Sequence, residues 1–176
     1  MRLLWIAPFP YFLTNKIHHP APWIKMLAYR LKDVSDIDLT ILSTTSFINT
    51  EYEEASKDGI KFIFLKHKNH VLTNELTFFK KRINVVKKYL EKNSNQYDLI
   101  HLHGSEHQYH TSASGVDLPK VLSIQGIVSE VAKVIPDKMT VKYVTMKMGS
   151  YYEHRDLKKV PNFSCRTHWD TAFIKK

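Results

Sequence analysis

Short, unbroken apolar runs recur along this chain and alternate with stretches that have helical spacing. Each run has the length of a β-strand, and several are rich in Ile, Val or Phe; they occupy residues 3–7, 39–42, 60–65, 99–102, 121–124 and 163–165. Continuous rather than alternating hydrophobicity is typical of strands that are covered on both faces, as in a parallel sheet. The runs therefore predict a buried, mostly parallel sheet.

Helical patterns fill the intervals between these runs. The clearest covers residues 77–92, where one apolar stripe consists of Phe79, Ile83, Val86 and Leu90. The basic residues of this stretch, Arg82 among them, fall largely off the stripe. This pattern predicts a helix that packs one face on the sheet and turns a basic face to solvent.

Further helices are expected at residues 23–34, 146–159 and 169–174, whereas residues 127–143 give no clear signal. Repeated alternation of strands and helices is the pattern of an α/β domain with helices on both faces of its sheet. A chain of 176 residues suits one such domain. We therefore expect residues 1–176 to form a single Rossmann-like domain, a three-layer sandwich around a mostly parallel sheet.

Composition excludes several other classes of protein. One cysteine cannot form an internal disulfide, so a disulfide-stapled secreted scaffold is excluded. No apolar run approaches the roughly 18 residues of a membrane-spanning helix. Pro8 and Pro10 interrupt the apolar N-terminus, whereas a signal peptide has an unbroken apolar stretch. The net charge of +9 suits a nucleic-acid partner, but no DNA- or RNA-binding motif is present. We expect a cytoplasmic protein that binds no nucleic acid.

Polar residues follow the ends of four predicted strands. Because parallel strands end at a common edge, where open α/β sheets bind ligands, these residues are candidates for one site. They are Lys16, His18, His19, His103, Gly104, Gln125, Gly126, Arg166, Thr167 and Asp170. The sequence has neither the G-x-x-x-x-G-K-[ST] motif of a P-loop nor the G-x-G-x-x-G motif of a dinucleotide site.

A histidine cluster offers an alternative function. His101 and His103, followed by Glu106 and His107, resemble the H-x-H-x-D-H ligand run of zinc hydrolases. One extra residue separates the second histidine from the acidic residue, which would turn ligands away from a common ion. We expect His101 to pack within its strand, His103 to emerge at its end, and no metal to bind. A zinc-dependent hydrolase that uses His101, His103 and His107 is the alternative.

Several motifs occur in an order that is typical of a known family. The first strand ends in Trp-Ile-Ala-Pro at residues 5–8, and residues 97–104 read Tyr-Asp-Leu-Ile-His-Leu-His-Gly, like the family's "DvvHxH". Residues 121–126 resemble a strand ending in "HG", here Gln-Gly, and residues 163–170 resemble a strand and turn with a "vSxxxxxxl" pattern. The chain thus resembles the N-terminal domain of family 4 glycosyltransferases, which have the two-domain GT-B fold and retain anomeric configuration.

The resemblance implies a function for this domain. It would bind the acceptor of a retaining, hexosyltransferase-type enzyme that transfers a sugar from a nucleotide-sugar to a glycan or lipid-linked acceptor, as in cell-envelope polysaccharide biosynthesis. The nucleotide-sugar is a co-substrate, and no other cofactor is implied. The pocket for the nucleotide-sugar, with the E-x7-E motif, belongs to a C-terminal domain that is absent from this chain. The chain stops abruptly after two lysines, as a front piece would, and we expect it to be inactive alone.

The resemblance also implies roles for single residues. His103 would hydrogen-bond an acceptor hydroxyl and orient it for attack. Gly126 would let substrate approach the backbone, although an ordinary turn glycine explains it equally well. Arg166 would neutralise phosphate charge, with a salt bridge to Glu153 or Asp170 as the alternative. The family's Gly-Gly pair after the first strand is missing here, where the sequence reads His-His-Pro-Ala-Pro.

The basic helix suggests one further partner. Its lysines lie beside Phe78 and Phe79, a combination that suits peripheral contact with an anionic membrane at the inner face of the cell. A helix packed on the sheet with a solvated lysine face is the other explanation. The expected partners are therefore the nucleotide-sugar, the acceptor, the C-terminal domain of the same protein and an anionic membrane surface.

Overall fold

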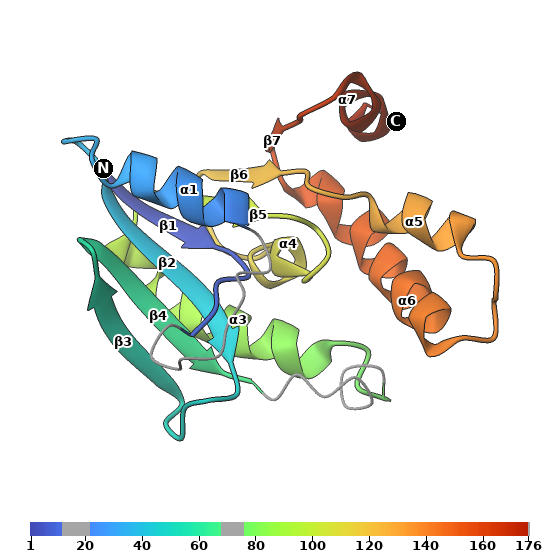
Figure 1. Ribbon diagram of the computed structural model, residues 1–176, viewed down its shortest axis with the longest axis horizontal. Coiled ribbons are helices and arrows are strands. Elements are labelled where there is room, and N and C mark those ends of the chain that lie inside the picture. Colours follow the sequence, from blue (N-terminus) through green and yellow to red (C-terminus); the bar gives the residue numbers. More distant parts are fainter. Residues whose placement is uncertain (12–21, 68–75, 176) are drawn as a thin grey trace.

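The computed structural model describes residues 1–11, 22–67 and 76–175. These residues form a seven-stranded sheet with the order β3-β4-β2-β1-β5-β6-β7 (Figure 1). All neighbouring strands are parallel except the antiparallel pair β3 and β4. The strands are β1 (Arg2–Ile6), β2 (Asp38–Thr45), β3 (Tyr52–Lys57), β4 (Ile60–Lys66), β5 (Leu99–His103), β6 (Lys120–Ser123) and β7 (Asn162–Ser164). The predicted α/β class and mostly parallel sheet are confirmed.

Strand β1 lies at the centre of the sheet. It pairs with β2 on one side, where Leu3 is opposite Leu39, and with β5 on the other, where Leu3 is opposite Leu99. Its Leu4 and Trp5 point to opposite faces of the sheet, and each is at most 1% exposed. Continuous apolar sequence in β1 therefore reflects burial on both faces.

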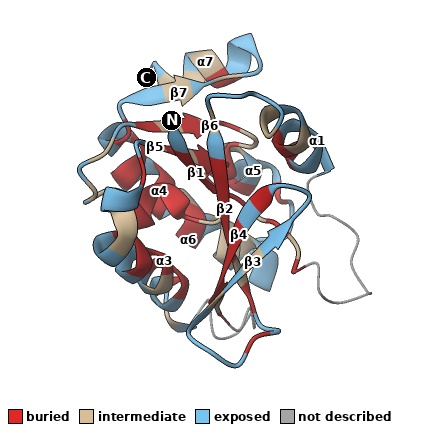
Figure 2. Cartoon of the chain, turned by 90° about the vertical axis from the view of Figure 1, so that its left-hand side faces the viewer, coloured by how far each residue is buried: buried red, intermediate tan, exposed pale blue. Residues whose placement is uncertain are grey.

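Helices cover the two faces. They are α1 (Pro22–Leu31), α3 (Lys80–Asn93), α4 (Tyr109–Ser112), α5 (Val128–Val134), α6 (Val141–Asp156) and α7 (His168–Ile174), with single 3-10 turns at Ser94–Gln96 and Leu157–Lys159. Figure 2 shows α1 on one side of the sheet and α3 and α4 on the other. Ile24 of α1 belongs to the same core cluster as Trp5, whereas Val86 of α3 packs with Leu4 and Leu102. Within the described residues, no helix has the length and apolar character needed to cross a membrane.

The structure adds an edge strand that the apolar runs do not predict. Among the described strands, β3 pairs only with β4, and its side chains are exposed or half-buried. The two strands are joined at Asp58 and Gly59, whose φ angles of 54° and 81° are those of a tight hairpin turn. The Asp-Gly pair was thus the available sequence signal for this hairpin.

Helix boundaries also differ from the expectation. Helix α3 begins at Lys80 rather than residue 77, because Phe78 and Phe79 have positive φ angles of 47° and 56°. The stretch without a clear signal contains α5 and the beginning of α6, which starts at Val141 rather than residue 146.

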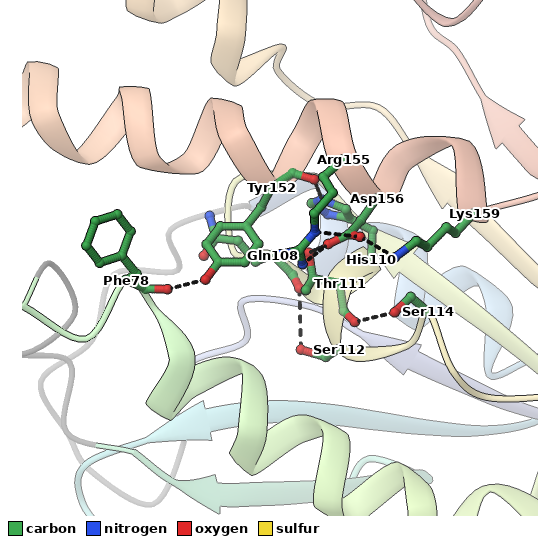
Figure 3. A network of polar contacts seen from close by, with 10 residues as sticks. All are labelled: Phe78, Gln108, His110, Thr111, Ser112, Ser114, Tyr152, Arg155, Asp156 and Lys159. Atoms are coloured by element: carbon green, nitrogen blue, oxygen red, sulfur yellow. Dashed lines mark hydrogen bonds and ion pairs between the residues drawn. The ribbon is translucent and has the colours of Figure 1, made fainter.

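Helix α6 is attached to the domain by buried polar groups. The Asp156 carboxylate accepts hydrogen bonds from Thr111 of α4 at 2.8 Å and from Lys159 at 2.7 Å, as well as from its neighbour Arg155 (Figure 3). The Tyr152 hydroxyl donates to the carbonyl oxygen of Phe78 at 2.5 Å. Helix α6 therefore fixes both α4 and the turn that precedes α3.

Candidate functional site

The carboxyl ends of β5, β6 and β7 lie side by side, as parallel pairing requires. The Gly104 amide after β5 donates to the Ser123 carbonyl at 2.9 Å, and the Ile124 amide after β6 donates to the Ser164 carbonyl at 3.0 Å. The Arg166 guanidinium after β7 donates to the carbonyl oxygen of Gln125. We call Gly104, Glu106, Gln125, Gly126 and Arg166 the strand-end rim.

Glu106 occupies the centre of this rim. A Cβ atom built on Gly104 would stand 2.1 Å from Oε2 of Glu106, and one built on Gly126 would stand 2.7 Å from Oε1. The residue remains open to solvent, yet desolvation by surrounding atoms raises the pKa of the carboxyl, which the charge of Arg166 partly offsets. From the sequence, Glu106 was a candidate only as a metal ligand and not as a residue of this rim; Gly104 and Gly126 were the available signal.

Arg166, Thr167 and Asp170 form the beginning of α7. The Thr167 hydroxyl accepts a hydrogen bond from the Asp170 amide at 3.1 Å, and the Asp170 carboxylate accepts from the Thr167 amide at 3.1 Å, a reciprocal capping box. Thr167 and Asp170 are therefore engaged in holding the helix. The Arg166 guanidinium is exposed and forms a salt bridge with neither Glu153 nor Asp170 among the described residues.

The histidines of β5 are placed in the reverse of the expected order. His103 is 2% exposed, whereas His101 is half-buried, so His103 does not emerge at the strand end. The reason is Trp5 of β1, whose ring centroid lies 4.4 Å from that of His103. Nε2 of His101 lies 2.7 Å from the Ser123 hydroxyl, while Nδ1 of His103 makes only a 3.5 Å contact with the Gln125 amide. Nε2 of His103 has no hydrogen-bond partner within residues 1–11, 22–67 and 76–175.

Burial keeps these imidazoles neutral. It lowers the pKa of His101 to about 4, and burial together with the neighbouring His101 lowers the pKa of His103 to about 3. Burial also lowers the pKa of His107 to about 4, with a further contribution from the positive charge of Arg82. Each ring therefore acts at neutral pH as a hydrogen-bonding group without charge.

The geometry does not support the zinc alternative. In the part of the chain that the structure describes, no three His, Cys, Asp or Glu side chains are arranged to hold a metal ion. The ring centroids of His101 and His103 lie 4.1 Å apart. The His107 ring instead stacks on that of Tyr109, and the positive charge of Arg82 contributes to lowering its pKa. The positive charge of a guanidinium next to a metal-ligating side chain disfavours the binding of a metal cation there. The three histidines thus do not form one site.

Three of the predicted contacts lie outside the described residues, namely Lys16, His18 and His19.

Two cavities bear on the location of a ligand. One, of about 590 Å³, lies at the amino ends of the strands, where Arg2, Asp38 and Lys61 line it. The other, of about 470 Å³, reaches from Glu106 of the rim to Arg82 of α3. Because open α/β sheets bind ligands at the carboxyl ends of their strands, the second cavity is the candidate site.

Comparison with known proteins places this geometry in a recognised architecture. No protein-family model and no curated protein matches the sequence. Solved structures do match. They include the trehalose-6-phosphate synthase OtsA (TM-score 0.61, 9% identity), the apo UGT2 of Phytolacca americana (0.56, 13%) and an α,α-trehalose-phosphate synthase of Burkholderia xenovorans in complex with glucose-6-phosphate (0.55, 10%). The chain has the fold of one half of a GT-B glycosyltransferase.

The match with these GT-B structures extends over nearly all of this chain and less than half of the others. It covers 99%, 97% and 98% of this chain but 43%, 47% and 41% of OtsA, the UGT2 and the Burkholderia synthase, respectively. The expected GT-B half is therefore confirmed as a fold. At these identities the match carries the arrangement of strands and helices, not the chemistry of single residues.

Proposed function

We propose that this chain is the acceptor-binding domain of a retaining glycosyltransferase, which moves a hexose from a nucleotide-sugar to a glycan or lipid-linked acceptor. The observation that carries the proposal is the strand-end rim in a GT-B half. There two glycines, a carboxylate, an amide and an exposed guanidinium lie close together. Such groups suit a sugar, whose hydroxyls need several hydrogen-bond donors and acceptors in fixed positions.

Each rim residue has a part in this proposal. Gly104 and Gly126 have no side chain and so let the Glu106 carboxylate lie close to the backbone, where it accepts hydrogen bonds from acceptor hydroxyls. The Gln125 amide hydrogen-bonds acceptor hydroxyls, and Arg166 neutralises phosphate charge in the reaction. Thr167 and Asp170 contribute by fixing the turn that carries Arg166.

His103 takes an indirect part. Its ring is buried and meets the side chain of Gln125, so we assign it the positioning of that amide rather than direct contact with the acceptor. Lys16, His18 and His19 remain proposed contacts of the same site.

The rest of the enzyme is proposed by the same argument. A C-terminal domain outside residues 1–176 would bind the nucleotide-sugar, the sole co-substrate, and the pathway would be cell-envelope polysaccharide biosynthesis in the cytoplasm. Contact with an anionic membrane is proposed for α3, since its lysines are exposed and Phe78 is 55% exposed. Sedimentation with anionic liposomes tests this contact, and salt-insensitive or absent binding would contradict it.

The acceptor site can be tested on the 176-residue chain. Amide NMR signals are followed during titration with neutral mono- and disaccharides and, separately, with UDP-glucose. We expect the saccharides to move the signals of Gly104, Gln125 and Gly126, and UDP-glucose to bind weakly. Gln125→Ala should weaken saccharide binding. Gln96→Ala, which removes an exposed amide at the amino ends of the strands, should not. Saccharide-induced shifts confined to the amino ends of the strands would overturn the proposal.

A further inference from the structure

Arg82 is a buried cation without a counter-charge. It lies in the first turn of α3 and is only 7% exposed, although its sequence position suggested a solvated face. Its Nη2 donates to the Gln108 side-chain oxygen, and its Nε has no hydrogen-bond partner in the part of the chain that the structure describes. Among the described residues, no carboxylate forms a salt bridge with it. Burying a charge is unfavourable unless it is paired, so this arrangement needs an explanation.

The guanidinium is held in place by a strained turn. Phe78 and Phe79 both have left-handed backbone conformations, which non-glycine residues rarely adopt. The Tyr152 hydroxyl holds the Phe78 carbonyl (Figure 3), and the Phe79 ring lies 5.0 Å from Cζ of Arg82. Strain of this kind persists where the surrounding structure enforces it, and it gathers at ligand sites.

Arg82 lines the cavity of about 470 Å³ that reaches the strand-end rim. This volume lies in the range of small-molecule sites. Most of the remaining lining is apolar, with Val128 of α5 and Met146 of α6 as examples, and Lys142 supplies a second positive charge. The site thus combines a largely apolar wall with cations.

Within the described lining, the one carboxylate is that of Glu106, and it forms no salt bridge with Arg82. The Glu106 carboxylate lies against Gly104 and Gly126, where the charge of Arg166 lowers its pKa. His107, which also lines the cavity, is neutral. The Arg82 end of the cavity therefore has net positive charge and an unused N–H donor.

We infer that this cavity binds a phosphate ester, with the Arg82 guanidinium on the phosphate and the rim on the attached sugar or other organic group. A guanidinium offers parallel N–H donors that match phosphate oxygens. The inference rests on the proposed function, because it states that the acceptor is phosphorylated. A sugar phosphate and a prenyl phosphate share this chemistry.

The test is a binding titration of the 176-residue chain with four probes. These are glucose 6-phosphate, geranyl phosphate, inorganic phosphate and glucose, each followed by amide NMR and calorimetry. We expect one of the two esters to bind at least 10-fold more tightly than glucose, with shifts at Gln108 and Gly149, and inorganic phosphate to compete. The ester that binds identifies the class of acceptor.

Variants separate a binding role from a structural one. Arg82→Gln should weaken ester binding at least 10-fold, while the unliganded variant unfolds at the same or a higher urea concentration, because an unpaired buried charge has been removed. Arg30→Gln removes an exposed cation of α1 and should change neither property. Lys142→Gln, at the cavity mouth, should weaken binding severalfold and serves if Arg82→Gln does not fold.

The outcomes distinguish this inference from the proposed function. Saccharide binding at the rim without any gain from a phosphate would overturn the inference and leave the proposed function standing. Conversely, ester binding that depends on Arg82, in a full-length protein that transfers no sugar, would overturn the proposed function and leave the phosphate site standing. Ester binding unchanged in both Arg82→Gln and Lys142→Gln would also overturn the inference.

Discussion

The carboxylate of Glu106 fills the space beside Gly104 that a side chain would need, since a Cβ there would stand 2.1 Å from Oε2. The same carboxylate crowds Gly126 from the other side, at 2.7 Å. The position of this negative charge on the rim therefore depends on two residues that have no side chain.

Gly104→Ala should displace Glu106 while destabilising the domain modestly. Gly104 has a φ of 83°, and an alanine in this left-handed region costs about 1–2 kcal/mol. Gly59→Ala is the matched control, because Gly59 has a φ of 81° and nothing lies within 4 Å of an added Cβ. Urea unfolding should show similar losses for the two variants. Only Gly104→Ala should shift the Glu106 carboxyl carbon signal in NMR, and an unmoved signal would contradict the arrangement.

Glu153→Ala should be strongly destabilising. The buried carboxylate accepts hydrogen bonds from the Ser105 hydroxyl at 2.7 Å and from the first amides of α5, those of Val128 at 3.0 Å and Ser129 at 2.8 Å. Truncation leaves these donors unsatisfied, and we expect a loss of about 3 kcal/mol or more in the free energy of unfolding. Glu130→Ala, which removes a carboxylate of α5 itself that is paired with the exposed Lys133, should cost about 0.5 kcal/mol or less. Equal losses would be inconsistent with this capping role.

Acid unfolding should depend on Asp156. Burial alone would raise the pKa of this carboxyl, but hydrogen bonds from Arg155, Lys159 and Thr111 lower it well below the ordinary 3.8. A lowered folded-state pKa means that the stabilisation is fully present above the unfolded-state pKa and is lost as the pH falls below it. Asp156→Asn should therefore flatten the decline in stability between about pH 5 and pH 2, measured by urea unfolding at each pH. An equally steep decline in the variant would refute this account.

His103 should remain neutral well into the acidic range. Its folded-state pKa of about 3 lies below the ordinary 6.5, so its contribution to stability is complete above pH 6.5 and decreases as the pH falls from there toward 3. Its ring signals in NMR should keep their neutral positions from pH 8 to pH 5. The urea-unfolded chain is the control, in which the same ring should titrate near 6.5. Titration of the folded ring near 6.5 would show that Trp5 does not bury it.

Much of the fold was predictable from the sequence, because a strand that is buried on both faces has a continuous run of apolar residues. Strands β1 and β2 carry that pattern, and the parallel pairing of β5, β6 and β7 places the residues after these three strands together. The expectation that polar residues gather at one edge follows from this topology alone. It required no knowledge of single contacts.

The remainder depends on contacts between distant residues. Strand β3 has exposed side chains and exists through pairing with β4, while α5 is only seven residues long and is held by Glu153 from α6. Arg82 falls off the apolar stripe of its helix, but α3 packs against α4 as well as the sheet, so a second face is buried. Helical periodicity describes one buried face, which is why both Arg82 and the cavity beside it were missed.

Strand β1 is the seam of the sheet, because it is the strand that lies between β2 and β5. Residues 2–6 join a half-sheet of β2, β3 and β4 to a half-sheet of β5, β6 and β7. Leu3 pairs with Leu99, which lies far along the chain, so the two halves of the sheet are joined only when β5 pairs with β1. Loss of residues 2–6 would consequently leave two half-sheets with no strand between them, and the strand-end rim would survive only if β5, β6 and β7 remained together without β1.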